Sequence, residues 1–243
     1  MVIIVCGDKN DNSMDKVAVL TGDLVKSRTI KSGEIETVIN SLKNTFNELN
    51  TKVLFNKASF QIFRGDSFQA IIPYPELAII SAIIIRAHLR TFESSYSLAG
   101  EKRSNKPINY AYTDARIAIG IGEVSYLGNK VSESQGEAFQ KSGYLLDKLK
   151  KENERLGVDT PWENVNKEIY VESKLADAVI SRWTANTAMA VYIHLLDKKN
   201  QSELASILKI TQPATHKRLV TYGNIGSINS FVERYIELIT KAK

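Results

Sequence analysis

The order of strand-like and helix-like segments is the feature that most constrains this fold. A β-branched run over residues 16–22 ends in Gly-Asp, and residues 35–49 then carry apolar side chains at the spacing of an amphipathic helix. The later segments, in chain order, are two β-rich runs joined at Arg-Gly-Asp (52–63 and 67–73), a helix opened by Pro75, a loop (97–114), a strand (116–128) and a helix (136–154). This order predicts an α+β domain with the ferredoxin-like βαββαβ arrangement and appended elements.

Charge is divided unequally along the chain, whose formal net charge is +5. Residues 1–172 hold 22 Lys and Arg against 22 Asp and Glu, whereas residues 173–243 hold 10 against 5. A small basic unit is typical of proteins with a polyanionic partner, although a solubilising surface explains the same excess.

The charge pattern and the segment pattern together predict two domains. Residues 14–172 form the α+β domain, and residues 173–243 form a small all-α domain. A short strand (168–173) and a long helix (175–196) are expected to lead to the C-terminal tail. Residues 1–13 are either an extra edge strand or a segment upstream of a translation start at Met14.

Composition excludes several classes of protein. With 43% hydrophobic residues, the 243-residue chain can bury a core. Its single cysteine, Cys6, cannot close an intrachain disulfide. The N-terminal apolar run is shorter than the about 7 to 15 residues of a signal-peptide core. The richest apolar stretch, residues 77–89, is interrupted by Arg86 and is shorter than the about 20 residues of a membrane span. We therefore expect a cytoplasmic protein with no membrane partner.

Two aspartates follow glycines at predicted turns. Asp23 comes after the first strand, and Asp66 lies in the predicted hairpin. These turns fall at the same end of adjacent strands in a ferredoxin-like sheet, so two carboxylates would face one point, as a Mg²⁺ site requires. Gly22 and Gly65 would let backbone N–H groups approach a phosphate. The alternative is structural, because Asp after Gly is common in turns and Asp23 can cap the following helix.

Four blocks of the sequence carry a resemblance: VLTGDLVKSR, FRGDSFQAII, RIAIGIGEV and SQGEAFQKSGYLLDKLK. In this order they resemble the SatD family of bacterial proteins from Met14 to the C-terminus. More distantly they resemble class III nucleotide cyclases and palm-type nucleotide polymerases. The resemblance implies that Asp23 and Asp66 hold magnesium, or alternatively manganese, and that a nucleoside triphosphate approaches the backbone of Leu24, Val25 and Ser27. It also implies a homodimer, because cyclase-type sites are often assembled across two subunits.

The sequence departs from the cyclase pattern on the helix over residues 136–154. Cyclases carry an Asn and an Arg there, and alignment on Gly136 puts Gln140 and Tyr144 in their places. Gln140 can still hydrogen-bond a nucleotide, but Tyr144 cannot supply the fixed positive charge that stabilises developing charge on phosphate. The other sources of positive charge are Lys141, Lys148 and Arg116.

Residues 201–221 have the pattern of a helix-turn-helix. Ser202 is the expected cap of the first helix and Thr211 of the second, which has Pro213 in its first turn. Lys209 stands where such turns often use Gly, so a strained backbone is expected there. The expected DNA-contacting residues on the second helix are Gln212, Thr215, His216, Lys217 and Arg218. The alternative is a module that only packs domains or dimers together.

The sequence as a whole favours a regulator that binds a nucleotide with magnesium in a cyclase-like domain and DNA through the helix-turn-helix. The first alternative is an enzyme that converts a nucleoside triphosphate into a cyclic or oligomeric nucleotide. The second alternative is a protein-interaction scaffold. Trp162 and Trp183 have apolar neighbours and are expected to pack in the core rather than stack on bases.

Overall fold

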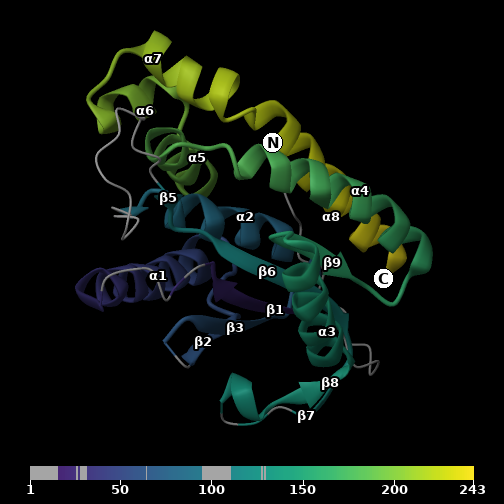
Figure 1. The fold of residues 1–243 in the computed structure, drawn as a ribbon. Coiled ribbons are helices and arrows are strands. Elements are labelled where there is room, and N and C mark those ends of the chain that lie inside the picture. Colours follow the sequence, from purple (N-terminus) through teal and green to yellow (C-terminus); the bar gives the residue numbers. More distant parts are fainter. Residues whose placement is uncertain are drawn as a thin grey trace.

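The computed structural model describes residues 16–25, 27, 32–63, 65–94, 111–126, 128 and 130–243. The predictions about residues 1–13 and a start at Met14 therefore lie outside the described residues. The chain is built around a five-stranded mixed sheet, in agreement with the predicted α+β class (Figure 1). The strands, in sheet order, are β2 (Ser59–Phe63), β3 (Ser67–Ile72), β1 (Val17–Leu24), β6 (Ala115–Gly122) and β9 (Leu156–Asp159).

Strand β1 is central and pairs antiparallel with β3 on one side and β6 on the other. Strand β2 pairs antiparallel with β3, and β9 pairs parallel with β6. In this register Asp23 lies opposite Ser67 on β3 and opposite Arg116 on β6. The end of β1 is thus surrounded by the ends of its two neighbours.

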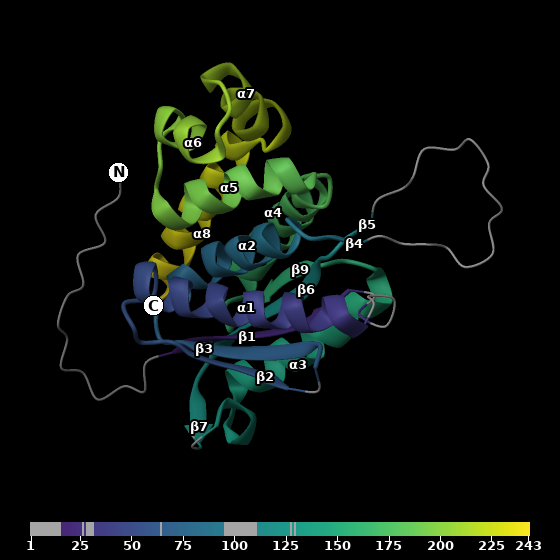
Figure 2. The same ribbon diagram turned by 90° about the vertical axis from the view of Figure 1, so that its left-hand side faces the viewer.

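Helices cover both faces of the sheet. Helices α1 (Ser32–Lys52) and α2 (Ala78–Leu89) lie on one face, and α3 (Glu137–Glu152) lies on the other (Figure 2). Phe46 of α1 packs on Phe68 of β3, while the Oγ1 atom of Thr21 on β1 lies 2.8 Å from the Oγ atom of Ser142 on α3. The alternation of side chains along each strand therefore assigns Phe68 and Thr21 to opposite faces.

Helix α2 is apolar almost all round, because it is buried on all sides. One side packs on the sheet and the other on the C-terminal helices. These are α4 (Glu163–Ile180), α5 (Ala185–Asp197), α6 (Gln201–Leu208), α7 (Gln212–His216) and α8 (Ile225–Ala242), with a π-helical segment η4 (Lys217–Tyr222) between α7 and α8. The buried apolar residues of these C-terminal helices belong to the same core cluster as most of those of the sheet, whereas Ala118 of β6 packs in a second, small cluster with Leu146 and Leu149 of α3.

The last helix, α8, returns alongside α4 and towards the sheet domain. The Tyr235 hydroxyl donates to the Pro75 carbonyl at 2.8 Å, and the Arg234 guanidinium lies 2.6 Å from the Glu168 carboxylate. Figure 2 shows α6 and α7 at the far end of the molecule, separated from the sheet by α5 and α2.

Small elements complete the fold. The two-residue strands β4 (Glu93–Ser94) and β5 (Ala111–Tyr112) pair with each other, as do β7 (Val124–Tyr126) and β8 (Gln135–Gly136). The short 3₁₀ helices are η2 (Pro75–Leu77) and η3 (Val131–Glu133). No helix among the described residues is long and apolar enough to cross a membrane.

Three expectations about secondary structure are wrong. The expected strand over 168–173 lies inside α4, where Ile169 and Ser173 are buried and Val171 between them is exposed, as helical spacing requires. The expected helix over 175–196 is interrupted, because Thr184 caps a new helix by accepting from the Thr187 N–H. Residues 52–58 are not a strand, since α1 runs to Lys52 and a turn with positive φ angles follows.

Candidate functional site

The two predicted carboxylates lie at the same end of the sheet. Asp23 is opposite Ser67, and Asp66 immediately precedes Ser67 in the β2–β3 turn. The Leu24 N–H donates to the Asp66 carbonyl at 2.8 Å, which ties the end of β1 to that turn. The expected neighbourhood of the two residues is therefore present in the fold.

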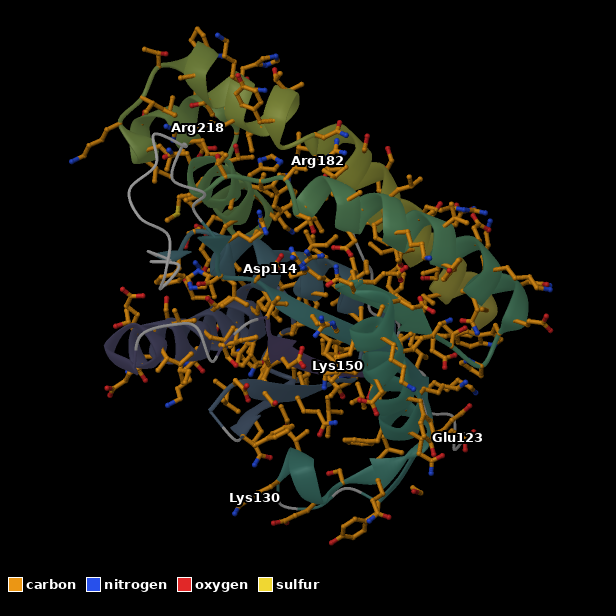
Figure 3. All side chains as sticks on the ribbon, viewed as in Figure 1. Asp114, Glu123, Lys130, Lys150, Arg182 and Arg218 are labelled. Carbon is orange, nitrogen blue, oxygen red and sulfur yellow. The ribbon has the colours of Figure 1, made fainter. Side chains whose placement is uncertain are left out.

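The carboxylate of Asp23 is engaged by two cations. Its Oδ1 atom lies 3.2 Å from Nη1 of Arg116, and its Oδ2 atom lies 3.1 Å from Nζ of Lys150 on α3. The side chains of Asp23 and Arg116 are only 15% and 12% exposed, so solvent screens this pair weakly. Figure 3 labels Lys150 on the helix that covers this face of the sheet. Arg116 is one of the three residues, with Lys141 and Lys148, that the sequence offered as other sources of positive charge.

Asp66 has different partners. Its Oδ2 atom accepts from the Ser27 hydroxyl at 2.7 Å, and the Ser67 hydroxyl lies 3.4 Å from its Oδ1 atom. Gly65 before it has a φ of 78°, a backbone conformation that glycine adopts without strain. The β2–β3 turn thus contributes Gly65 and Asp66, and Ser27 from the segment after β1 contacts Asp66 beside the end of that strand.

A magnesium ion fits this arrangement only if the Asp23 carboxylate first gives up its ion pairs with Arg116 and Lys150. Mg²⁺ takes oxygen ligands, but both oxygens of Asp23 face cations. In the described part of the chain no group of three or more His, Cys, Asp or Glu side chains gathers closely enough to hold a metal ion. Asp23 can ligate a metal if Arg116 and Lys150 are drawn to another anion.

The other predicted nucleotide contacts have structural roles or lie elsewhere. A Cβ at Gly22 would lie 2.3 Å from the Phe68 ring, so this glycine is needed for packing. The N–H groups of Leu24 and Val25 donate to carbonyls of Asp66 and Asp114, both at 2.8 Å. These two amides therefore point into the protein.

Gln140 is not brought to the aspartates by the fold. It is exposed on the first half of α3, whereas Lys150, which meets Asp23, lies near the end of that helix. Ten residues of α-helix span about 15 Å. Tyr144 is 77% exposed and also faces solvent. Within one subunit, neither residue adds to a site at Asp23.

Sequence reasoning missed a buried cluster around Asp114, near the centre of the molecule (Figure 3). Arg86 contacts the Asp114 carboxylate through Nε and Nη2, both at 3.0 Å, and two further arginines approach its Oδ2 atom. They are Arg90 at 2.9 Å and Arg155 at 3.0 Å. Burial raises the pKa of Asp114, but the charge and hydrogen bonds of Arg86 outweigh it, so the net pKa lies below the ordinary value. The available signal was the pair of arginines, four residues apart, in and after an apolar helix.

Residues 201–222, where the sequence predicts a helix-turn-helix over 201–221, fold as α6, a short turn and the helical segments α7 and η4. Thr211 caps α7 by accepting from the Ala214 N–H, and Lys209 ends α6 in the left-handed conformation at φ 52°, as the sequence indicated. The cap of α6 is Asn200 and not Ser202, because Asn200 forms a capping box with Glu203. Helix α7 and segment η4 are continuous, and we call residues 212–222 the second helix.

The side chains expected to contact DNA differ in exposure. Gln212, His216 and Lys217 are exposed, and Arg218 is half-buried. Thr215 is fully buried and its hydroxyl donates to the Thr211 carbonyl at 3.3 Å. The prediction for Thr215 is therefore wrong, because the helix turns this side chain inward.

Positive charge around the second helix has few acidic partners. Residues 182–222 hold six Lys and Arg but only two acids, Asp197 and Glu203. Both acids are in ion pairs, with Lys52 and Lys199. The cations that form no ion pair with a described acid are Arg182, Lys198, Lys209, Lys217 and Arg218. Figure 3 shows Arg182 and Arg218 above Asp114, in the helical part of the molecule.

The chain thus presents two polar regions, at the end of β1 and around the second helix. The described geometry puts two carboxylates and two cations in the first region. In the second it puts exposed polar side chains among cations that have no ion-pair partner within the described ranges. Comparison with known proteins adds no name to either region, since the chain matches no protein-family model and no curated protein sequence.

Proposed function

We propose that this protein binds double-stranded DNA through the second helix, residues 212–222. The observation that carries the proposal is that Gln212, His216 and Lys217 are exposed and lie among cations that form no ion pair with an acid in the described part of the chain. A helix of this kind enters the major groove with its N-terminal residues towards the base edges. Gln212 is the base-reading residue, because an amide can hydrogen-bond adenine through two atoms.

The surrounding cations are suited to phosphates. Arg182, Lys198 and Lys209 lie outside the second helix, and their ammonium or guanidinium groups have no described acid to compete with DNA. Neutralising phosphates releases counterions and makes the affinity fall with salt. The half-buried Arg218 contributes to the same field from the second helix.

A salt series with the full chain tests this proposal. Fluorescence anisotropy with a random-sequence duplex should detect binding at low salt, and the affinity should fall steeply as salt rises. Lys217→Ala should lower the slope of log affinity against log salt by about 1. Lys57→Ala is the matched control, because Lys57 is also exposed and unpaired among the described residues but lies far away in the α1–β2 connection. Absence of binding at low salt, or equal slopes for both variants, contradicts the proposal.

A second proposal concerns the end of β1, where a nucleoside triphosphate is the ligand. It is supported by the strand order β2-β3-β1-β6, by the strand–helix–strand–strand–helix–strand order of a ferredoxin-like palm, and by the resemblance to SatD proteins and class III cyclases. The specific observation is that Arg116 and Lys150 lie at Asp23. Phosphates that attract these two cations would release the Asp23 carboxylate, which with Asp66 and Ser27 would offer oxygen ligands to a magnesium or manganese ion.

Calorimetric titration of ATP and GTP with Mg²⁺ tests the second proposal. Arg116→Ala should weaken binding of the triphosphate, and Asp66→Asn should reduce the dependence of binding on the metal. Lys151→Ala is the control, since Lys151 is exposed on α3 next to Lys150 without a described ion pair. Formation of a cyclic or oligomeric nucleotide above the Asp66→Asn background would identify an enzyme. A result in which neither nucleotide nor DNA binds favours the second alternative of the sequence analysis, an interaction scaffold.

A further inference from the structure

Trp183 joins the second helix to the rest of the molecule. It lies in the connection between α4 and α5, residues 181–184, and its side chain is fully buried. Its indole N–H donates to the carbonyl of Gly223 at 3.1 Å. Gly223 directly follows η4, so this hydrogen bond holds the C-terminal end of the second helix.

Gly223 lies at a position where the surrounding atoms leave no room for a side chain. A Cβ at this position would lie 2.6 Å from the Leu219 carbonyl oxygen and 2.7 Å from that of Arg218. It would also lie 3.0 Å from Cγ2 of Val191 on α5. The end of the second helix therefore packs closely on α5, and the Trp183 indole fixes its backbone from a second direction.

The backbone of the α4–α5 connection is in turn held from α2. The Arg90 guanidinium donates to the Trp183 carbonyl through Nε at 3.2 Å and Nη2 at 2.7 Å. The same Nη2 atom donates to the Ser181 carbonyl at 2.8 Å. A planar guanidinium that donates to two carbonyls fixes the orientation of this connection. A single hydrogen bond does not fix it.

Arg90 is itself oriented by the buried cluster. Its Nη1 atom lies 2.9 Å from Oδ2 of Asp114, and Asp114 is also bound by Arg86 and Arg155. Arg86 further contacts Asp177 on α4 at 2.8 Å. A continuous set of buried polar contacts thus runs from Asp114 through Arg90 and Trp183 to the end of the second helix.

We propose that Trp183 is a positioning residue for DNA recognition: it sets the orientation of the second helix and thereby the sequence preference. This inference rests on the DNA binding proposed above. Contacts to base edges depend on the angle of the helix in the groove, whereas contacts to phosphates tolerate small rotations and carry no sequence information. Loss of the indole contact should therefore reduce discrimination between sequences more than it reduces overall attraction to DNA.

The test uses the full chain and Trp183→Phe, which keeps an aromatic ring and removes the N–H donor. The preferred duplex is first selected from a random library with the wild-type protein. For Trp183→Phe we expect the affinity for this duplex to fall about tenfold, the size of one lost base contact. The affinity for non-specific DNA and its salt slope should change less than twofold at the same salt.

Trp162→Phe is the matched control. Trp162 is half-buried against the same core, and its indole N–H makes no hydrogen bond in the described part of the chain. This variant should keep both affinities. If Trp183→Phe does not fold, Arg90→Lys is the second test. Lysine keeps the positive charge beside Asp114 but cannot donate to both the Ser181 and the Trp183 carbonyls as Arg90 does. This variant should also lose discrimination between DNA sequences more than overall affinity.

The outcomes separate the two proposals. If the wild-type protein binds no duplex, the DNA-binding function and this inference both fail. If it binds, but Trp183→Phe retains full discrimination, only the inference fails. An equal fall in specific and non-specific affinity, accompanied by a lower melting temperature, shows a purely structural tryptophan and also overturns the inference.

Discussion

Asp114 and Arg86 form a buried bidentate ion pair. The Nε–Oδ1 and Nη2–Oδ2 distances are both 3.0 Å, and the side chains are 2% and 0% exposed. Desolvation of two such charges offsets much of their attraction, so the pair adds little net stability compared with a well-packed apolar pair. Removal of one partner is different, because it leaves the other charge buried and uncompensated.

Asp114→Asn should therefore be strongly destabilising. Three arginines would remain around a neutral amide, and we expect the free energy of unfolding to fall by about 3 to 5 kcal/mol. Urea unfolding followed by circular dichroism measures the change. Asp147→Asn is the control: Asp147 is 72% exposed on α3, and its replacement should cost less than about 0.5 kcal/mol. A similar small loss in both variants would show that the arginine cluster is not electrostatically coupled to the fold.

The Asp114 carboxylate should also make the free energy of unfolding depend on pH in the acidic range. The pKa of Asp114 is lowered in the folded protein, despite the opposing effect of burial, because Arg86 and its neighbours favour the charged form. A lowered folded-state pKa contributes stability that is fully present above the unfolded-state pKa of about 4 and is lost as pH falls towards the folded-state value. The difference in unfolding free energy between wild type and Asp114→Asn should therefore be constant from pH 7 to 5 and smaller at pH 3. A difference that does not shrink at pH 3 would contradict this assignment.

The sequence predicted those features that depend on local pattern. Alternation and glycine-containing turns identified β1 and the β2–β3 hairpin, and cap chemistry at Thr211 identified the start of α7. Short segments were harder. The four-residue strand β9 was missed, since its place is decided by parallel pairing with β6 and not by its own residues.

The sites were predicted less completely than the fold. Asp23 and Asp66 lie at the same end of the sheet because strand order fixes that. The ion pairs of Asp23 with Arg116 and Lys150 depend instead on side-chain geometry across two other elements. The cluster at Asp114 joins residues 24 to 41 positions apart, so no local motif reveals it. Arg86 inside the apolar run over residues 77–89 was the available signal, because a buried charge needs a partner, but an acidic partner was not predicted from it.

Gly120 on β6 and Gly143 on α3 should respond in opposite directions to replacement by alanine. A Cβ at Gly120 on β6 would lie 2.3 Å from the Ala138 carbonyl oxygen and 2.4 Å from the Ser142 nitrogen, both backbone atoms of α3. Gly120→Ala must move α3 away from the sheet, and we expect a loss of about 1 to 3 kcal/mol in unfolding free energy.

Gly143→Ala is the matched comparison on α3 itself. A Cβ at Gly143 meets nothing within 4 Å, so alanine adds no clash and reduces the conformational freedom of the unfolded chain. We expect a gain of about 0.5 to 1 kcal/mol. Thermal and urea unfolding of the two variants measure both changes. Destabilisation of similar size in both would show that close packing of α3 on β6 is not the reason for Gly120.

Lys209 connects backbone strain with the proposed DNA contact. It ends α6 in the left-handed conformation, with φ 52° and ψ 45°, which costs a residue with a side chain about 1 kcal/mol or more. Lys209→Gly should remove this strain and raise the unfolding free energy by about 0.5 to 1 kcal/mol.

Because Lys209 is also an exposed cation without a described acidic partner, its loss should lower the salt slope of DNA binding by about 1. Lys198→Gly is a close parallel, since Lys198 ends α5 at φ 53° and is also exposed. Stability and DNA affinity must therefore change in opposite directions in Lys209→Gly, and a variant that loses both, or gains both, would show that the turn is not strained or that Lys209 does not face the duplex.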